Sequence, residues 1–256
     1  MTAPPCKDGR AIDAPLFRVA LRRRLRVPVF NQEECCPCCG EQMDIWGDHC
    51  LSCCCAGDRV VRHNDVRNVV YNECRAAGLR TEKEKAGLLP PRAAEEGLPP
   101  CRSARRPADV WQPQGPSGGQ EAWDFTVGSG MSPHLLELSA RSPEEVIAIF
   151  EERKRLHLDT SRLCSDSGFL FCPMVLEAHG GGWSSGLRKA MVWVSVTASS
   201  IGHDSQFTYS LRAAQRISCS LQRENARAVL RRTVDPGGEV AEFVSQIAEV
   251  VDFAWQ

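Results

Sequence analysis

The chain has 256 residues, an apolar fraction of 43%, a charged fraction of 25% and a net charge of −1. These values are typical of a globular protein with one large domain, or with a domain and a small module. No apolar run reaches the ~18 residues of a membrane span, and the first residues lack the order of a secretion signal, so we expect neither a membrane protein nor a secreted one. A net charge near zero does not indicate nucleic-acid binding, which would depend on local arginine clusters.

The N-terminal part of the chain is predicted to contain a connector helix and a metal site. Residues 1–30 carry a helical pattern from Pro15 to Leu25 that ends at Val27-Pro28. Eight of the 14 cysteines then fall between Cys35 and Cys55. Without a secretion signal, such a cluster indicates metal binding rather than a disulfide framework.

The spacing within this cysteine cluster favours a structural zinc site. Cys36 and Cys39 precede the turn residue Gly40, and His49 and Cys53 follow one helical turn apart. Three thiolates and an imidazole are ligands of structural Zn²⁺, and a closed set of four leaves no position free for chemistry. The register stays open, because other nearby residues could substitute: Cys35, Cys38, Cys50, Cys54 and Cys55.

A helix is predicted after the cysteine cluster, from Arg59 to Gly78, where glycine can end it. Its early residue His63 has three interpretations: a capping or structural histidine, a phosphate contact, or an additional zinc ligand. Residues 90–106, rich in Pro, Arg and Glu, are expected to form a flexible approach to the first long strand.

Two short apolar runs are predicted to pair as a hairpin that places two acids side by side. Residues 107–111 and 122–127 have the strand pattern, and the loop between them is rich in Pro and Gly. A turn centred near Pro116-Ser117 sets Asp109 roughly opposite Asp124 on one sheet face. Two such carboxylates either repel each other, which raises one pKa, or bind a divalent cation.

A lysine on the next predicted helix is the third candidate residue. Ser142 and Pro143 start a helix over residues 144–158, and Lys154 lies within its apolar stripe. The side chain either snorkels to water or points its ammonium at the carboxylate pair. Two acids and a lysine suit metal-dependent phosphodiester hydrolysis, in which the metal activates water and the lysine stabilises developing charge.

The rest of the chain is predicted to supply a buried strand and scaffold helices. Residues 168–177 form an apolar run in which Pro173 favours an edge position or a bulge. Helical patterns follow over residues 187–198, 206–232 and 239–255, and the second carries several arginines that could line DNA.

These motifs resemble one known family. Pro107-Ala108-Asp109 and Asp124-x-Thr126, with Lys154 displaced onto the following helix, resemble the PD-(D/E)XK nuclease superfamily. More narrowly, they resemble the restriction-like endonuclease at the C-terminus of site-specific non-LTR retrotransposon polyproteins. The preceding Cys-Cys-His-Cys motif is similar to the zinc motif of the same retroelements. His157 departs from the pattern, at a place where related sequences tend to carry Tyr.

The resemblance implies an α/β fold, with a mixed central sheet flanked by helices and a small N-terminal zinc knuckle. It implies that Asp109 and Asp124 hold Mg²⁺ or Mn²⁺, that Lys154 is catalytic, and that Glu84 is either a further metal ligand or an ordinary exposed acid. The expected divisions are a connector helix (1–30), the zinc knuckle (31–58), a restriction-like endonuclease core (59–185) and a helical scaffold (186–256).

The expected function is a metal-dependent DNA endonuclease that nicks one strand, since one copy of the site cuts one strand. The expected partners are DNA and, by the resemblance, a reverse transcriptase or its RNA–protein complex. Access to chromosomal DNA implies the nucleus. The alternative is a catalytically inactive zinc-containing nucleic-acid-binding or interaction module, because detached retroelement pieces can lose selection for cutting.

Overall fold

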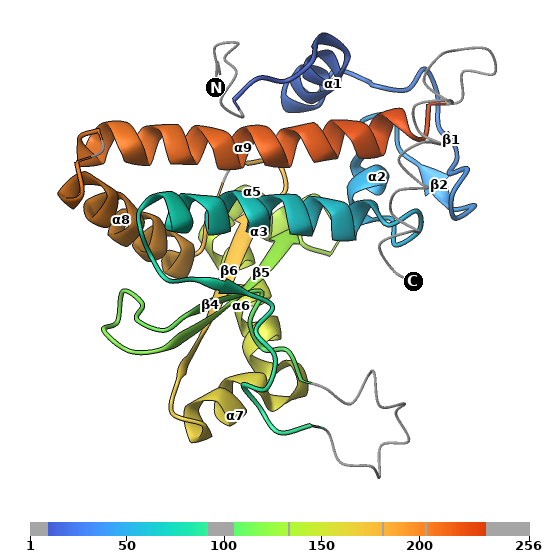
Figure 1. Cartoon of the computed structure of the whole chain (residues 1–256). Coiled ribbons are helices and arrows are strands. Elements are labelled where there is room, and N and C mark those ends of the chain that lie inside the picture. The colour runs from blue at the N-terminus through green and yellow to red at the C-terminus, as the bar shows by residue number, and fades with distance from the viewer. Residues whose placement is uncertain (1–9, 92–104, 133, 181, 203, 234–256) are drawn as a thin grey trace.

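The computed structural model describes residues 10–91, 105–132, 134–180, 182–202 and 204–233 (Figure 1). It is a mixed α/β structure in which helices flank a four-stranded sheet, as expected from the sequence. The helix predicted over residues 239–255 lies outside the described residues. Within the part that the structure describes, no helix combines the length and apolar character needed to cross a membrane.

The central sheet has the strand order β3-β4-β5-β6, with β6 parallel to β5 and the other neighbours antiparallel. The strands are β3 (Glu82–Lys83), β4 (Val110–Gln112), β5 (Glu121–Gly128) and β6 (Leu170–Glu177). In the β4–β5 hairpin, Val110 pairs with Trp123, which matches the turn centre predicted near Pro116-Ser117. Pro173 lies in β6, an edge strand of this sheet, where proline is tolerated.

Two helices cover one face of the sheet, α3 (Asp58–Ala76) and α8 (Ser185–Ser200), and α9 (Gln206–Leu230) packs on both of them. Trp123 and Phe125 of β5 belong to the largest buried apolar cluster, together with residues from all three helices. Along α9, buried residues recur every four positions: Tyr209, Ala213, Ile217 and Leu221. This stripe directs one side of α9 into the core, and complete burial of a large apolar side chain stabilises the fold by roughly 1.5–3 kcal/mol.

The chain between β5 and β6 forms a second helical layer. It contains α5 (Leu136–Arg141), α6 (Pro143–Leu156), a 3₁₀ turn (His157–Asp159) and α7 (Thr160–Asp166). The sequence predicted that the α6 helix runs to Leu158, but Leu158 and Asp159 have positive φ angles of 52° and 58°. The helix therefore ends two residues earlier than predicted, since residues in the left-handed region do not continue an α-helix.

The N-terminal segment packs on the far side of α9. α1 (Ala14–Arg24) lies along α9, and the ribbon of β1 (Glu34–Cys35) and β2 (Gln42–Met43) leads into α2 (Asp48–Ser52), which contacts the C-terminal end of α9 (Figure 1). α9 thus contacts the sheet-covering helices on one side and the N-terminal segment on the other.

Candidate functional site

The hairpin brings Asp109 and Asp124 together. Asp109 lies directly before β4, and its backbone N–H donates to the carbonyl of Trp123 at 2.9 Å, which continues the hairpin register. Its Oδ2 atom accepts a hydrogen bond of 2.6 Å from the N–H of Phe125. The Asp109 carboxylate is therefore fixed by the strand that carries Asp124.

Lys154 reaches this acid pair from α6. Its Nζ atom lies 2.9 Å from Oδ2 and 3.1 Å from Oδ1 of Asp124. The side chain is 28% exposed, so the ion pair is partly shielded from water. Of the two positions considered for this lysine, the structure shows the one directed at the carboxylates.

His63 is a further residue of the site. It projects from α3, and its Nε2 atom lies 3.2 Å from Oδ1 of Asp109. The sequence left its role open and did not connect it with the acids, because this contact joins residues 46 positions apart on different elements. The only local signal was a histidine near the start of a helix expected to pack on the sheet.

The two carboxylates are electrostatically unequal. Burial raises the pKa of Asp124 to about 6; Lys154 opposes this shift and the neighbouring charge of Asp109 adds to it. Burial acts in the same direction on Asp109, but hydrogen bonds from His63 and from the Phe125 amide outweigh it and hold the pKa of Asp109 below its ordinary value. Two adjacent acids whose pKa values are pushed apart are typical of a functional site.

A cavity of about 230 Å³ opens beside Asp124 and Lys154. Three further polar side chains among its lining residues can carry positive charge: Arg105, Arg106 and His157. Cationic groups around a buried carboxylate suit a ligand that is itself anionic and that binds together with a cation. His157 is thus part of the lining.

Glu84 is placed beside arginines. Its carboxylate pairs with Arg67 and lies 3.5 Å from Nη1 of Arg106, while its backbone N–H donates to the carbonyl of Asp109. Among the described residues, its carboxylate does not group with those of Asp109 and Asp124 closely enough for one ion to contact all three.

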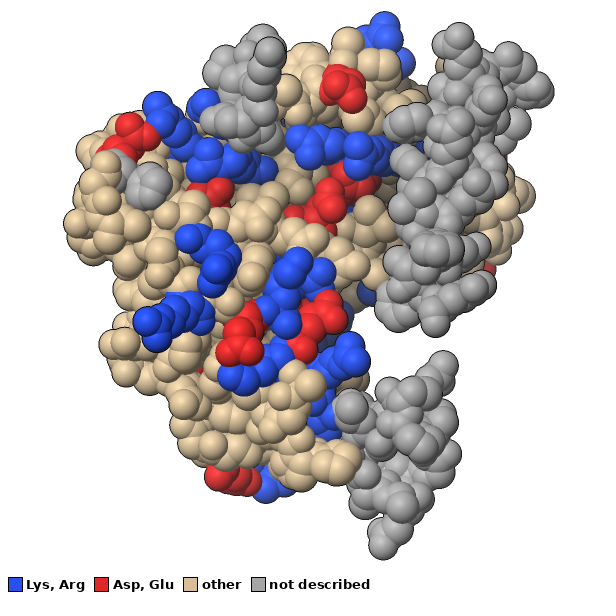
Figure 2. All heavy atoms as spheres, viewed as in Figure 1, with Lys and Arg blue, Asp and Glu red and all other residues tan. Residues whose placement is uncertain are grey.

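The arginines near the end of α9 do not form a free basic face. Arg232 is buried, and Arg227 and Arg231 pair with Glu224 and Asp58. Figure 2 shows basic and acidic side chains interspersed over the visible face of the molecule. The arginine pattern in the sequence therefore does not give an unpaired basic stripe, because Glu224 of the same helix and Asp58 of α3 neutralise these side chains.

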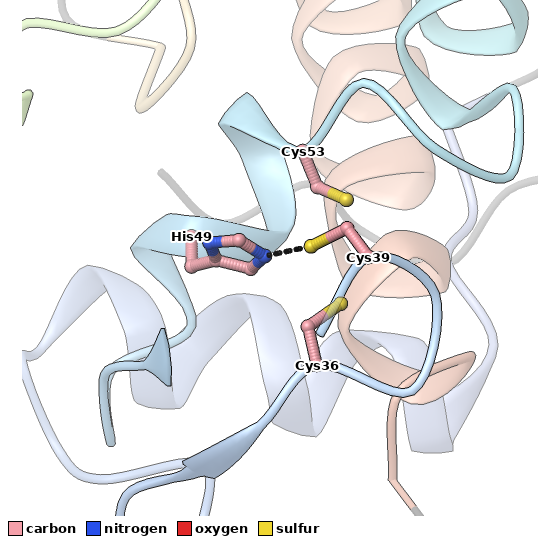
Figure 3. Close-up of side chains that lie close together, drawn as sticks. All are labelled: Cys36, Cys39, His49 and Cys53. Atoms are coloured by element: carbon pink, nitrogen blue, oxygen red, sulfur yellow. Dashed lines mark hydrogen bonds between the residues drawn. The ribbon is translucent and has the colours of Figure 1, made fainter. Parts of the chain in front are cut away.

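The second candidate site is a cluster of Cys36, Cys39, His49 and Cys53. One ligand atom from each lies within 4.8 Å of the others, and Figure 3 shows the four side chains converging. The loop between β1 and β2 supplies Cys36 and Cys39, with Gly40 at φ +78° just after them, while α2 and its C-terminus supply His49 and Cys53. This set could hold a metal ion and is compatible with zinc. The structure thus favours one register among those that the sequence left open.

Asp44 holds the backbone that leads into α2 and His49. Its carboxylate accepts backbone hydrogen bonds from Trp46, Asp48 and His49 at 2.8 to 3.0 Å, so it caps α2 and fixes the backbone of His49. Burial alone raises the pKa of Cys36, but the amides of Cys38 and Cys39, with Arg232, lower it to about 6. The thiolate, which is the form that binds metal, is therefore favoured at Cys36, whereas at Cys39 the Glu41 backbone lowers the pKa but burial and the sulfurs of Cys36 and Cys53 raise it to about 12.

Comparison of the chain with protein-family models, with curated proteins and with solved structures finds no match. The functional argument therefore depends on the geometry of the two sites and on the chemistry of their residues.

Proposed function

We propose that this protein is a metal-dependent DNA endonuclease with a restriction-like core. The observation that carries the proposal is the pair of adjacent carboxylates, Asp109 and Asp124, with the ammonium of Lys154 bound to Asp124 at the edge of a cavity lined by arginines. The resemblance of the same three residues to the PD-(D/E)XK pattern supports it independently of the fold.

The acid pair fits a hard divalent cation. Two adjacent, partly buried carboxylates repel each other. Burial raises the pKa of Asp124, and the repulsion from Asp109 raises it further. Mg²⁺ or Mn²⁺ held by Asp109 and Asp124 would relieve it, and carboxylate oxygens are the ligands these ions prefer. When bound there, the ion would supply Lewis-acid polarisation of a phosphate and an activated water.

The protein's own groups have distinct tasks in this proposal. Lys154 stabilises the negative charge that develops on the phosphate. Because the ion pair with Asp124 already holds the ammonium in place, little further ordering of the side chain is needed during the reaction. His63 holds Oδ1 of Asp109 and the Phe125 amide holds Oδ2, so this ligand is orientated from both sides. Arg105 and Arg106 bind the phosphates of the DNA strand, contacts that position the substrate without specifying sequence.

Zn²⁺ in the Cys36, Cys39, His49 and Cys53 site has a structural role in this proposal, because four protein ligands leave no open position. The retroelement resemblance further suggests a reverse transcriptase or its RNA–protein complex as partner. It also suggests that the protein cleaves chromosomal DNA in the nucleus. One copy of the acid pair predicts cutting of one strand.

Substitution Asp109→Asn separates this function from that of a DNA-binding module without catalysis. The amide keeps the shape of the side chain but removes a charged metal ligand. We expect the variant to bind a labelled DNA duplex with unchanged affinity and to cleave it at least about 100-fold more slowly in Mg²⁺. The matched control is Asp166→Asn, an exposed acid on α7 that pairs with Arg162, and it should cleave normally. Equal cleavage by both variants would contradict the proposal.

A further inference from the structure

The C-terminal end of α9 packs directly on the cysteine–histidine cluster. Val229 is fully buried in an apolar group that includes Cys36, Cys50 and Cys53. The approach is so close at Gly47, which has a φ of +77°, that an added Cβ would lie 3.1 Å from Cγ2 of Val229. Helix α9 and the knuckle therefore share an interior.

Arg232, just beyond α9, is buried at this interface and is only 1% exposed. Its Nη1 atom donates to Oδ2 of Asp58 at 2.7 Å and to the carbonyl of Ala228 at 2.6 Å. Burial lowers the pKa of Arg232, but Asp58 and the neighbouring sulfur atoms of Cys53 and Cys36 outweigh it and raise the pKa above its ordinary value. Its Nε and Nη2 atoms are buried and make no hydrogen bond to any residue that the structure describes. Two donors of a fixed, buried cation are thus available beside two of the metal-binding sulfurs.

The net charge of the zinc-loaded cluster indicates what these two N–H donors of Arg232 could do. Three thiolates and a neutral imidazole around Zn²⁺ carry a net charge of about −1. A buried net charge is unfavourable unless a group of opposite charge lies beside it. Arg232 is that group, and Asp58 fixes its orientation through the Nη1 hydrogen bond.

We propose that Arg232 is a positioning residue of the metal site, which donates N–H groups to the thiolates of Cys36 and Cys53 and thereby couples metal binding to the docking of α9. Hydrogen bonds of this kind orient metal ligands and reduce the charge that they must hold in a buried site. Loss of the metal would leave the Nε and Nη2 donors without thiolate acceptors and loosen the last turn of α9. The proposal does not depend on the nuclease activity.

The test is the zinc affinity of the whole chain, measured by competition with a chromogenic chelator at pH 7. We expect Arg232→Met to bind Zn²⁺ about 10- to 100-fold more weakly than the unsubstituted protein. The matched control is Arg212→Met, near the other end of α9, where the arginine is exposed and pairs with Asp204. It should leave the zinc affinity unchanged.

Substitution of Asp58 distinguishes two roles of Arg232, as a donor to the sulfur atoms and as a partner in the Asp58 ion pair. Asp58→Asn keeps a side-chain oxygen that can accept the Nη1 hydrogen bond and hold Arg232 beside the thiolates, so the zinc affinity of this variant should stay close to that of the unsubstituted protein. The double variant Asp58→Asn with Arg232→Met removes both buried charges, which limits the loss of stability, and it should still bind zinc weakly. The proposal is wrong if Arg232→Met binds zinc with unchanged affinity. It is also wrong if Asp58→Asn alone lowers the zinc affinity as much as the double variant does.

Hydrogen exchange gives a second readout on the unsubstituted protein. Removal of zinc should raise amide exchange in the last turn of α9, over residues 226–230, and leave residues 209–215 of the same helix protected. Equal exchange at both ends, with and without zinc, would show that metal binding and helix docking are not coupled.

Discussion

At the scale of single residues, Asp124 is the centre of the candidate site. This carboxylate lies between the charge of Asp109 and the ammonium of Lys154, and burial makes its charged form unfavourable. The sequence was sufficient to predict that Asp109 and Asp124 lie opposite each other, because hairpin register follows from strand pattern and turn composition. It was not sufficient to find His63, whose contact with Asp109 depends on how α3 packs on the sheet.

The raised pKa of Asp124 predicts a pH dependence of divalent-metal binding. Below about pH 6 this carboxyl is protonated and cannot serve as an anionic ligand, so Mn²⁺ affinity should fall by about tenfold per pH unit there and level off above. Isothermal titration with Mn²⁺ on the zinc-loaded protein between pH 5 and 8 measures this. Asp124→Asn should bind Mn²⁺ weakly at every pH. A steady affinity across this range in the unsubstituted protein would contradict the assignment of Asp124.

At the scale of elements, the position of α6 relative to β5 decides whether Lys154 reaches Asp124. The two elements meet at Gly128, the last residue of β5, where an added Cβ would overlap the ring of Phe150. Glycine at this position lets the helix approach the strand, and Lys154 lies one helical turn after Phe150. The close approach therefore supports the ion pair on which the proposed chemistry depends.

We expect Gly128→Ala to destabilise the protein by about 1–3 kcal/mol, because the methyl group forces α6 outwards. Chemical denaturation with zinc present measures the free energy of unfolding. Gly119→Ala is the matched control, since an added Cβ in this hairpin loop meets nothing within 4 Å. The control should change the stability by less than about 1 kcal/mol. Similar losses in both variants would show that the contact between Gly128 and Phe150 does not set the helix position.

The elements also show where prediction from sequence succeeded. The helix predicted from Arg59 to Gly78 is α3, which spans Asp58–Ala76, because its apolar spacing and terminal glycine are local signals. The turn at Leu158 was missed, since a left-handed residue other than glycine leaves no trace in periodicity. The pairing of Arg231 and Arg232 with Asp58 was missed for a related reason: it depends on a tertiary contact with α3.

At the scale of the whole molecule, α9 joins the two candidate sites. Its middle packs in the core that supports the sheet, and its end packs on the cysteine–histidine cluster. The cysteine–histidine cluster is therefore joined to the rest of the fold by a buried interface. In the proposed function, zinc stabilises the end of the scaffold, while the separate acid pair performs the chemistry.

Nicking of supercoiled plasmid in Mg²⁺ or Mn²⁺ tests the central claim most directly. The zinc-loaded protein should convert the plasmid to nicked circles only when the divalent metal is present, and Asp124→Ala should lose this activity by at least about 100-fold. Asp166→Ala, on the exposed side of α7, should nick normally. An intact plasmid after incubation with a folded, DNA-binding protein, or equal nicking by Asp124→Ala, would contradict the account.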